Sequence, residues 1–332
     1  MKTVLVISIY SDANTAVVCQ WLKHLKQPYL LVTPQSEVEV VAIYDNGDIQ
    51  LKIDGKHIKG SEIKSSWYRR GEFSIEKQLL SVPETENRQE AALYLAANNY
   101  IRLDYGDTIT YLYSWLRNKP HIDSILTANV NKLVVLNKAA ELGLTIPAWA
   151  VLSTKAEVSS FKQAQAQLIT KSVAGTGFFL AQSYYVQAYT EEVDDDFFTL
   201  LPETFPPSFF QKMVDKELEI RSYLLNEAFY SMAIFSQQNE QTAVDFRKYD
   251  RERPNRRVPF KLPRDLEEKL LKLAKLLKMD SCSFDLIYGK DSAYYFLEVN
   301  PVGQYGMTSS PCNYRIDKQI AELLAGNNTS QA

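Results

Sequence analysis

The alternation of apolar and polar positions predicts that the chain opens as an α/β domain. Residues 3–9 alternate as a strand, and residues 14–25 then place apolar side chains at helical spacing. The segments YLLVTP and VEVVAIYD follow as two further strands. This strand–helix–strand order is typical of an α/β domain.

The remaining pattern predicts a change of character after Pro120. Before it lie two expected helices, 83–103 and 108–117. After it, residues 131–143 have an apolar helical pattern that ends at Gly143. Short strands follow, then a hairpin with a turn at Asn226-Glu227. Residues 263–279 form a further, amphipathic helix. We therefore expect an N-terminal α/β domain and two further subdomains with a disordered tail, bounded as follows: 1–120, 121–207, 208–325 and 326–332.

Composition excludes several classes of protein. The chain has 332 residues, of which 45% are hydrophobic and 23% charged, and its net charge of −3 argues against a nucleic-acid-binding protein. Three widely spaced cysteines indicate neither a disulfide framework nor a zinc site, so we expect a cytoplasmic protein. The first residues fit a strand better than a signal peptide, and no apolar run is long enough to predict a membrane span.

Two carboxylates are predicted to face each other near the C-terminus. The segment SCSFDLIYGKDSAYYFLEVN reads as a hairpin whose loop is 290–293, which places Asp285 opposite Glu298 and Asn300 one step along the same face. Like charges in that position are destabilising unless a cation holds them, and two carboxylates with an amide oxygen are ligands that Mg²⁺ prefers. The alternative is a shifted register in which one carboxylate pairs with Lys or Arg.

Two charged runs lie outside this hairpin. The acidic run 190–197 is most simply a solvated loop, and RKYDRERPNRR (247–257) is a basic loop.

Asp285 followed by EVNPVGQYG resembles the C-terminal magnesium signature of ATP-grasp ligases, and four upstream segments resemble other blocks of that family in the family's order. They are NKLVVLNKAAELG, LITKSVAGTGFF, FFQKMVDKELEIRSYLL and VDFRKY. The resemblance implies an ATP-grasp fold, α/β with α+β subdomains, behind an N-terminal α/β pre-ATP-grasp domain.

The resemblance also implies roles for individual residues. Asp285, Glu298 and Asn300 would hold Mg²⁺, and Arg247 and Arg221 would act on the transferred phosphate or acyl phosphate. The ATP-binding residues would be two lysines, two loop glycines, the hinge strand against which adenine packs, and an acidic residue after it: Lys132, Lys171, Gly175, Gly177, Gln211, Lys212, Met213, Val214 and Glu219.

The segment SSWYRRGEF and the C-terminal block together resemble the ATP-grasp peptide maturases of graspetide pathways, microviridin-type and grasp-with-spasm. Such enzymes use ATP and Mg²⁺ to join Asp or Glu side chains of a ribosomally made precursor, with its leader and acidic core, to Thr, Ser or Lys side chains. The resemblance implies a precursor-peptide partner and a homodimer, with no nucleic acid and no membrane. Two alternatives remain: a ligase that adds an amino acid to a protein tail or small molecule, and an ATP-binding scaffold without catalysis.

Overall fold

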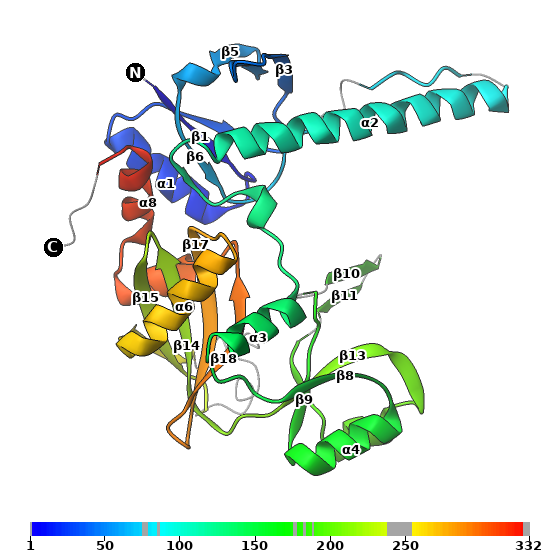
Figure 1. The fold of residues 1–332 in the computed structure, drawn as a ribbon, viewed down its shortest axis with the longest axis vertical. Coiled ribbons are helices and arrows are strands. Elements are labelled where there is room, and N and C mark those ends of the chain that lie inside the picture. Colours follow the sequence, from blue (N-terminus) through cyan, green and yellow to red (C-terminus); the bar gives the residue numbers. More distant parts are fainter. Residues whose placement is uncertain are drawn as a thin grey trace. The chain divides into compact units, whose positions relative to one another are not determined.

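The computed structural model describes residues 2–74, 79–84, 87–174, 178–181, 184–187, 189–237 and 254–327. The chain divides into two compact units (Figure 1). The first combines residues 1–129 with 315–332, and the second is 130–314. The predicted separation of 121–207 from 208–325 within the second unit stays a prediction.

The first unit is built on a parallel sheet, as the opening pattern predicts. Its strand order is β2-β1-β6-β7, and α1 (Ala13–His24) connects β1 to β2. Asp12 caps α1 by accepting a hydrogen bond from the Thr15 backbone N–H at 2.9 Å. The strands of this sheet are β1 (Thr3–Ile7), β2 (Tyr29–Val32), β6 (Ile63–Tyr68) and β7 (His121–Ile122).

A small antiparallel sheet interrupts the connection between β2 and β6. It consists of β3 (Val38–Ile43), β4 (Ile49–Ile53) and β5 (Lys56–Lys59). A single 3-10 turn, η1 (Gly60–Glu62), leads from it into β6.

The prediction of two helices over 83–103 and 108–117 is wrong, because one helix, α2 (Arg88–Leu116), spans both. Gly106 lies in its interior, where a glycine costs only about 1 kcal/mol and does not have to end a helix. The residues beyond it offset that cost, since Ile109, Leu112 and Tyr113 are buried. A second 3-10 turn, η3 (Ile125–Thr127), follows β7.

The C-terminal helix α8 (Ile316–Leu324) belongs to the first unit and contacts α1. Its end is held by two side chains of β6, because Ser65 Oγ donates to the Leu324 carbonyl at 2.7 Å and Lys64 Nζ donates to the Ala325 carbonyl. Of the tail expected to be disordered, residues 328–332 lie outside the described residues, whereas the Asn327 backbone N–H bonds the Glu322 carbonyl.

The second unit contains two larger sheets and a hairpin. One sheet has the order β12-β9-β13-β8 and the other β16-β15-β14-β17-β18. The helix α3 (Lys132–Glu141) precedes them and ends, as predicted, before Gly143, whose φ is +74°.

The elements of the four-stranded sheet and its surroundings are β8 (Trp149–Thr154), α4 (Lys155–Gln165), β9 (Leu168–Thr170), β12 (Glu191–Glu192), α5 (Asp195–Leu200) and β13 (Thr204–Lys212). β10 (Phe178–Ala181) and β11 (Tyr184–Gln187) form an antiparallel hairpin. The acidic run predicted as a loop instead supplies β12 and the cap of α5, where Asp194 accepts a hydrogen bond from the Phe197 N–H at 2.7 Å. Lys162 lies 3.1 Å from Asp195, whose side chain is fully exposed.

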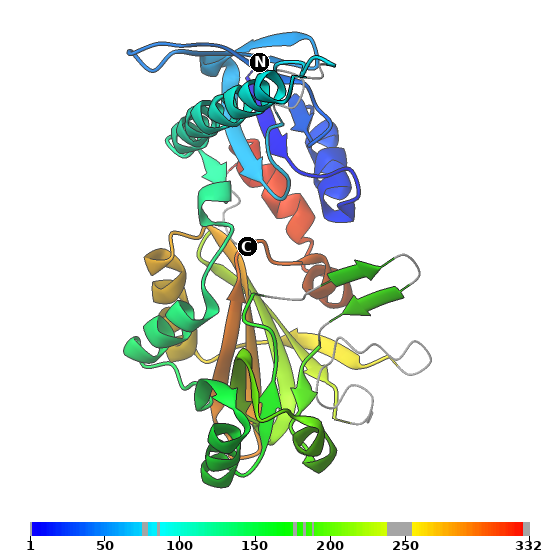
Figure 2. The same ribbon diagram turned by 90° about the vertical axis from the view of Figure 1, so that its right-hand side faces the viewer.

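The five-stranded sheet carries a helix on each face (Figure 2). Its elements are β14 (Lys216–Leu225), β15 (Ala228–Phe235), β16 (Arg256–Phe260), α6 (Arg264–Leu276), β17 (Ser281–Gly289), β18 (Tyr294–Asn300) and α7 (Gly306–Cys312). The hairpin β14–β15 turns at Asn226-Glu227, as predicted, and both residues have positive φ.

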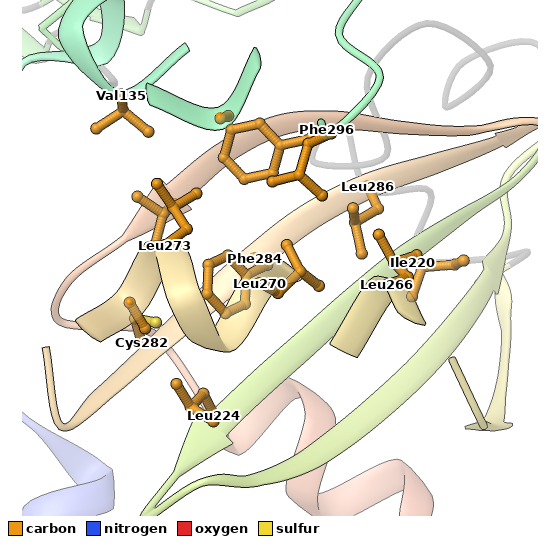
Figure 3. Packing of buried hydrophobic residues seen from close by; sticks show 14 of the residues in the cluster. Val135, Ile220, Leu224, Leu266, Leu270, Leu273, Cys282, Phe284, Leu286 and Phe296 are labelled. Carbon is orange, nitrogen blue, oxygen red and sulfur yellow. The ribbon is translucent and has the colours of Figure 1, made fainter. Parts of the chain in front are cut away.

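The main core lies between this sheet and the helices α3 and α6 (Figure 3). Alternate residues of β14 and β17, including Ile220, Leu224, Phe284 and Leu286, point toward Leu270 and Leu273 of α6. The opposite face packs Met232 and Ile234 of β15 against Cys312 of α7. Strand alternation therefore places Arg221 of β14 and Asp285 of β17 on the α7 side.

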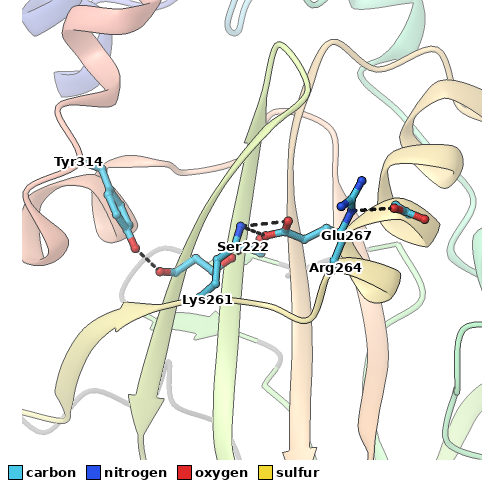
Figure 4. A network of polar contacts seen from close by, with 7 residues as sticks. Ser222, Lys261, Arg264, Glu267 and Tyr314 are labelled. Atoms are coloured by element: carbon cyan, nitrogen blue, oxygen red, sulfur yellow. Dashed lines mark hydrogen bonds and ion pairs between the residues drawn. The ribbon is translucent and has the colours of Figure 1, made fainter. Parts of the chain in front are cut away.

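Polar contacts join β14, β15 and Tyr314, and further ion pairs lie around the start of α6 (Figure 4). The Tyr314 hydroxyl bonds the Ser231 carbonyl at 2.5 Å, and the Ser222 and Ser231 hydroxyls lie 2.7 Å apart. Lys261, just before α6, pairs with Glu267, whose side chain is 17% exposed, and Arg264 pairs with Glu268 on the exposed surface of α6. No helix in the described ranges is both long and apolar enough to cross a membrane.

Candidate functional site

Three adjacent strands bring a guanidinium and two carboxylates into line on the α7 face of the five-stranded sheet. In the register of the sheet, Arg221 of β14 lies opposite Asp285 of β17, and Asp285 lies opposite Glu298 of β18. The predicted pairing of the two carboxylates is thus observed.

The strand register that produces this pairing differs from the predicted one in the part of the hairpin near the turn. Near the turn the register is one residue off, since Tyr288 rather than Gly289 pairs with Tyr294. A β-bulge between Asp285 and Leu286 then restores the expected register. Bulges add one residue to a strand and redirect side chains, and they are frequent beside active sites.

The Asp285 carboxylate is held from two sides. Asn300 Nδ2 donates to Asp285 Oδ2 at 3.0 Å, and Arg221 Nη1 lies 3.6 Å from Asp285 Oδ1. The carboxylate side chain is 17% exposed, so one side of it stays open to solvent. The ion pair with Arg that the alternative expected is therefore present, but without the register shift at Asp285 and Glu298 that it required.

Glu298 is held by Lys132, at the N-terminus of α3. Lys132 Nζ lies 2.9 Å from Glu298 Oε2 and donates to the Ser172 carbonyl at 3.0 Å. This lysine therefore links the edge strand β18 to the segment that follows β9. Its positive charge offsets the repulsion between Glu298 and Asp285.

The chemistry of these donors fits a magnesium ion. Asp285, Glu298 and Asn300 supply hard oxygen atoms on one face and are all partly accessible to solvent. No group of three or more His, Cys, Asp or Glu side chains in the described part of the chain could hold a metal ion, and here the third donor is an amide. Asn300 would have to turn its amide oxygen toward such an ion, and amide orientation is assigned from the hydrogen-bond network.

Glu219 is placed close to Arg221 but is engaged within the sheet. It forms an ion pair with Lys216 and accepts a hydrogen bond from Ser236 Oγ at 2.8 Å. All three side chains are buried. The sequence did not single out Lys216 or Ser236, although a Lys three residues before a Glu was a usable signal.

A second group of predicted residues lies on the four-stranded sheet. Lys171, just after β9, has its ammonium 5.8 Å from the centre of the Phe209 ring, and Phe209 stacks on Trp149. Gln211 of β13 shares the Phe209 face, because residues two apart in a strand point the same way.

Gln211 is buried, and neither its amide nitrogen nor its amide oxygen has a hydrogen-bond partner among the described residues. Burial of an unsatisfied amide costs on the order of 1–3 kcal/mol. A ligand with one donor and one acceptor would remove that cost. The sequence predicts that Gln211 belongs to the strand against which adenine packs, through its backbone. The structure indicates its side chain as a possible contact.

The next residues of the predicted hinge use part of their backbone within the sheet. The Lys212 N–H donates to the Ala148 carbonyl at 2.7 Å, and the Met213 N–H donates to the Gln167 carbonyl at 2.9 Å. Val214 follows directly. Gly175, Gly177 and Arg247, which complete the predicted set, lie outside the described residues.

We expect Gln211→Leu to stabilise the nucleotide-free protein by about 1–2 kcal/mol, because it removes the unsatisfied amide. The same substitution should weaken ADP binding about tenfold. Thermal melting without and with ADP measures both the gain in stability and the loss of ADP binding. Gln163→Leu, on the exposed surface of α4, serves as the control and should change neither. A destabilised Gln211→Leu protein with unchanged ADP affinity would contradict the expectation.

In the first unit, the two arginines of the segment WYRR form a separate charged cluster with Asp12. Arg69 and Arg70 direct their Nε atoms to Asp12 Oδ2, at 3.3 and 3.5 Å. Arg69 is buried and Arg70 is 37% exposed. The arrangement gives Arg69 a structural role at the N-terminus of α1 and leaves only Arg70 accessible.

Another feature that the sequence did not indicate is the contact between Gly303 and β17. A Cβ atom built on Gly303 would lie 2.2 Å from Ser283 Oγ and 2.7 Å from the Ser283 backbone nitrogen. The loop after Asn300 can follow this path only with glycine at position 303. Gly303 thereby sets the path of the chain directly beyond the Asp285–Asn300 pair.

Comparison with solved structures gives matches over nearly the whole chain, whereas no family model and no curated protein matches. The RiPP-associated ATP-grasp ligase of Chryseobacterium gregarium, in complex with ADP and a leader and core peptide, is 23% identical with a TM-score of 0.77. That match covers 98% of this chain and 97% of the other.

Two further solved structures are also similar to this chain over nearly its whole length. The macrocyclase MdnC of Microcystis aeruginosa MRC, bound with precursor peptide MdnA, is 24% identical with a TM-score of 0.74, covering 98% of this chain and 99% of that chain. The ATP-grasp ligase PsnB, complexed with a phosphomimetic minimal precursor, Mg and ADP, is 16% identical with a TM-score of 0.68, covering 99% of each chain. The predicted fold class is confirmed: the chain has the α/β fold of the ATP-grasp ligases.

Proposed function

We propose that this protein is an ATP-dependent carboxylate ligase that cyclises a ribosomally made precursor peptide. It activates Asp or Glu side chains as acyl phosphates and joins them to Thr, Ser or Lys side chains as esters or amides. The observation that carries the proposal is the alignment of Arg221, Asp285 and Glu298 on adjacent strands, beside Asn300 and Lys132, in an ATP-grasp fold. The similar ligases that contain precursor peptides support the peptide as substrate.

The acidic and amide residues have one proposed role, holding Mg²⁺, and the lysines have another, binding the nucleotide. Asp285, Glu298 and Asn300 are the proposed holders of Mg²⁺, which bridges phosphates and offsets their charge when bound. Lys132 and Lys171 supply cations for the nucleotide, and the Gln211 amide offers a donor and an acceptor to a nucleobase. Glu219, Lys212, Met213, Val214, Gly175 and Gly177 complete the proposed ATP site.

Arg221 and Arg247 are the proposed catalytic residues. A carboxylate is a poor electrophile until it is phosphorylated, and fixed cations stabilise the charge that develops on the transferred phosphoryl group. Arg221 is already anchored to Asp285 at 3.6 Å, so little reorganisation is needed to hold its guanidinium in place. No nucleophilic Ser or Cys is required by this chemistry.

Charge also suggests how the peptide is held. An acidic core peptide would meet the basic segment 247–257, of which 254–257 is described. The partly exposed Arg70 is a further cation for a core carboxylate. A basic leader would meet the acidic surface around Asp195 and Asp196. We place the reaction in the cytoplasm, where the three free cysteines stay reduced, and propose that the enzyme acts as a homodimer.

The decisive experiment is incubation with ATP, Mg²⁺ and a candidate acidic precursor, followed by mass spectrometry. Each ring formed should lower the peptide mass by one water, with one ADP released per ring. Tandem fragmentation then locates the linked residues. Tight ATP binding with no mass loss from any acidic precursor would overturn the macrocyclase proposal.

Two other functions are distinguished by the same assay. A ligase that adds an amino acid would raise the mass of its acceptor by one residue instead of lowering it by one water. A non-catalytic ATP-binding scaffold would release no ADP with any peptide. The intact set Asp285, Glu298 and Asn300 argues against the scaffold, because a protein without catalysis has less need of a complete set of magnesium ligands.

A further inference from the structure

Each carboxylate of the proposed magnesium site has a cation of the protein beside it. Lys132 Nζ lies 2.9 Å from Glu298 Oε2, and Arg221 Nη1 lies 3.6 Å from Asp285 Oδ1. Two positive and two negative charges cancel, so these four side chains are neutral as a group. All four are mostly shielded from solvent, which leaves their interactions only weakly screened by salt. A divalent cation that joined this group unchanged would therefore meet no net negative charge.

The two cations of the protein are held in different ways. Arg221 extends from β14, the central strand of the five-stranded sheet, and lies directly opposite Asp285 in the strand register. Lys132 instead approaches Glu298 from another element, as the first residue of α3, on a flexible four-carbon side chain. Its other contact given by the structure is a neutral acceptor, the Ser172 carbonyl at 3.0 Å. Lys132 is therefore the cation that can leave its carboxylate by rotation of its own side chain.

The ammonium of Lys132 and a metal ion compete for the same carboxylate. A metal ion bound to Glu298 would share that side chain with Lys132, and charges of the same sign on one carboxylate repel each other. Nucleotide phosphates offer the ammonium another anion to bind. Movement of Lys132 from Glu298 to a phosphate would remove the competition and restore a net negative charge to the group that remains.

We propose that Lys132 is an exchangeable cation of the metal site. In the nucleotide-free protein it neutralises Glu298 and keeps the affinity for a divalent cation low. When a nucleotide binds, Lys132 turns to the phosphates and leaves Glu298 to the metal ion. The inference rests on the nucleotide and magnesium sites of the proposed function, and it adds the coupling between them. Because such coupling is reciprocal, the metal ion should in turn strengthen nucleotide binding by the same factor.

This role differs in sign from that of a lysine that only binds phosphate. Removal of a simple phosphate-binding lysine would weaken nucleotide binding and leave the affinity for a metal ion alone unchanged. Removal of an exchangeable cation should weaken nucleotide binding and strengthen metal binding, because Glu298 loses the charge that competes with the metal ion. The two affinities therefore move in opposite directions.

The test is the binding of Mn²⁺ to the full chain without nucleotide, measured by electron paramagnetic resonance. Mn²⁺ prefers the same oxygen donors as Mg²⁺ and gives a signal of its own. Lys132→Met should bind Mn²⁺ at least ~10-fold more tightly than the wild type, and it should bind ADP about tenfold more weakly in EDTA, measured by calorimetry. Lys138→Met removes the same charge from another face of α3 and is the control that should change neither affinity.

Two further variants connect the gain to the charge of Lys132 on Glu298. Lys132→Arg keeps the charge and should bind Mn²⁺ as weakly as the wild type. Lys132→Met/Glu298→Gln should bind Mn²⁺ no more tightly than Glu298→Gln alone. Thermal melting checks that each variant is folded, and Lys132→Gln should show the same gain if Lys132→Met does not fold. Unchanged or weaker Mn²⁺ binding after loss of the Lys132 charge, or an equal gain in Lys138→Met, would overturn the proposal.

Neither a peptide nor turnover enters these measurements, so the inference and the ligase proposal can fail separately. Ring formation by the wild type, with unchanged Mn²⁺ affinity in Lys132→Met, would overturn only the exchange of Lys132. A gain in Mn²⁺ affinity without ring formation from any acidic precursor would support the exchange and overturn only the macrocyclase. Absence of Mn²⁺ binding by the wild type even with ADP would overturn the metal site and the exchange together.

Discussion

Glu298→Ala should lower turnover about a thousandfold or more while the protein stays folded. Glu298 is one of two opposed carboxylates, and loss of a magnesium ligand removes several kcal/mol of charge stabilisation from the transferred phosphate. Its side chain is 24% exposed on an edge strand, so the lost pair with Lys132 should cost no more than about 1 kcal/mol of stability. The measurements are ring formation by mass spectrometry and thermal melting.

Two further variants make the Glu298 result specific. Glu298→Gln keeps the size of the side chain but removes its charge, and it should raise the magnesium concentration needed for ADP binding. Glu268→Ala removes an exposed carboxylate that pairs with Arg264, and it should leave both turnover and magnesium dependence unchanged. Full turnover by Glu298→Ala would refute the metal role of Glu298.

Gly303→Ala should lower the free energy of unfolding by about 1–3 kcal/mol and reduce turnover at least tenfold. The added Cβ would lie 2.7 Å from the Ser283 backbone nitrogen, an atom of β17 that cannot move without displacing Asp285 two residues away. The loop that follows Asn300 would have to shift instead. Denaturant unfolding and the ring-formation assay measure the two effects.

Ser283 supplies the control for this contact. Its hydroxyl is buried without a hydrogen-bond partner in the part of the chain that the structure describes, so Ser283→Ala should be neutral or slightly stabilising. Ser283→Ala/Gly303→Ala should not regain full stability, because the Ser283 Cβ and backbone nitrogen still lie 2.8 and 2.7 Å from the new Cβ. A wild-type-like Gly303→Ala protein would show that the loop can move freely.

Local patterns predicted most elements of the fold, and their errors have physical causes. The first strands, the cap of α3 and the Asn226-Glu227 turn depend on neighbouring residues alone, and all three are observed. The expected split of α2 was wrong because Gly106 lies inside one continuous helix, whose residues Ile109 and Leu112 beyond it are buried. The acidic run was read as a loop because its pairing with β9 involves residues about twenty positions away.

For the candidate site, the sequence by itself determined which residue types are present and that Asp285 faces Glu298. Strand alternation and a hairpin are local, so chain order was enough to predict that pairing. Only the tertiary structure decided that Lys132 neutralises Glu298, that Arg221 anchors Asp285 and that the buried Gln211 amide has no partner in the described ranges. It alone also showed the bulge and the Gly303 contact. These features join segments far apart in the chain, and their geometry depends on packing that no local pattern encodes.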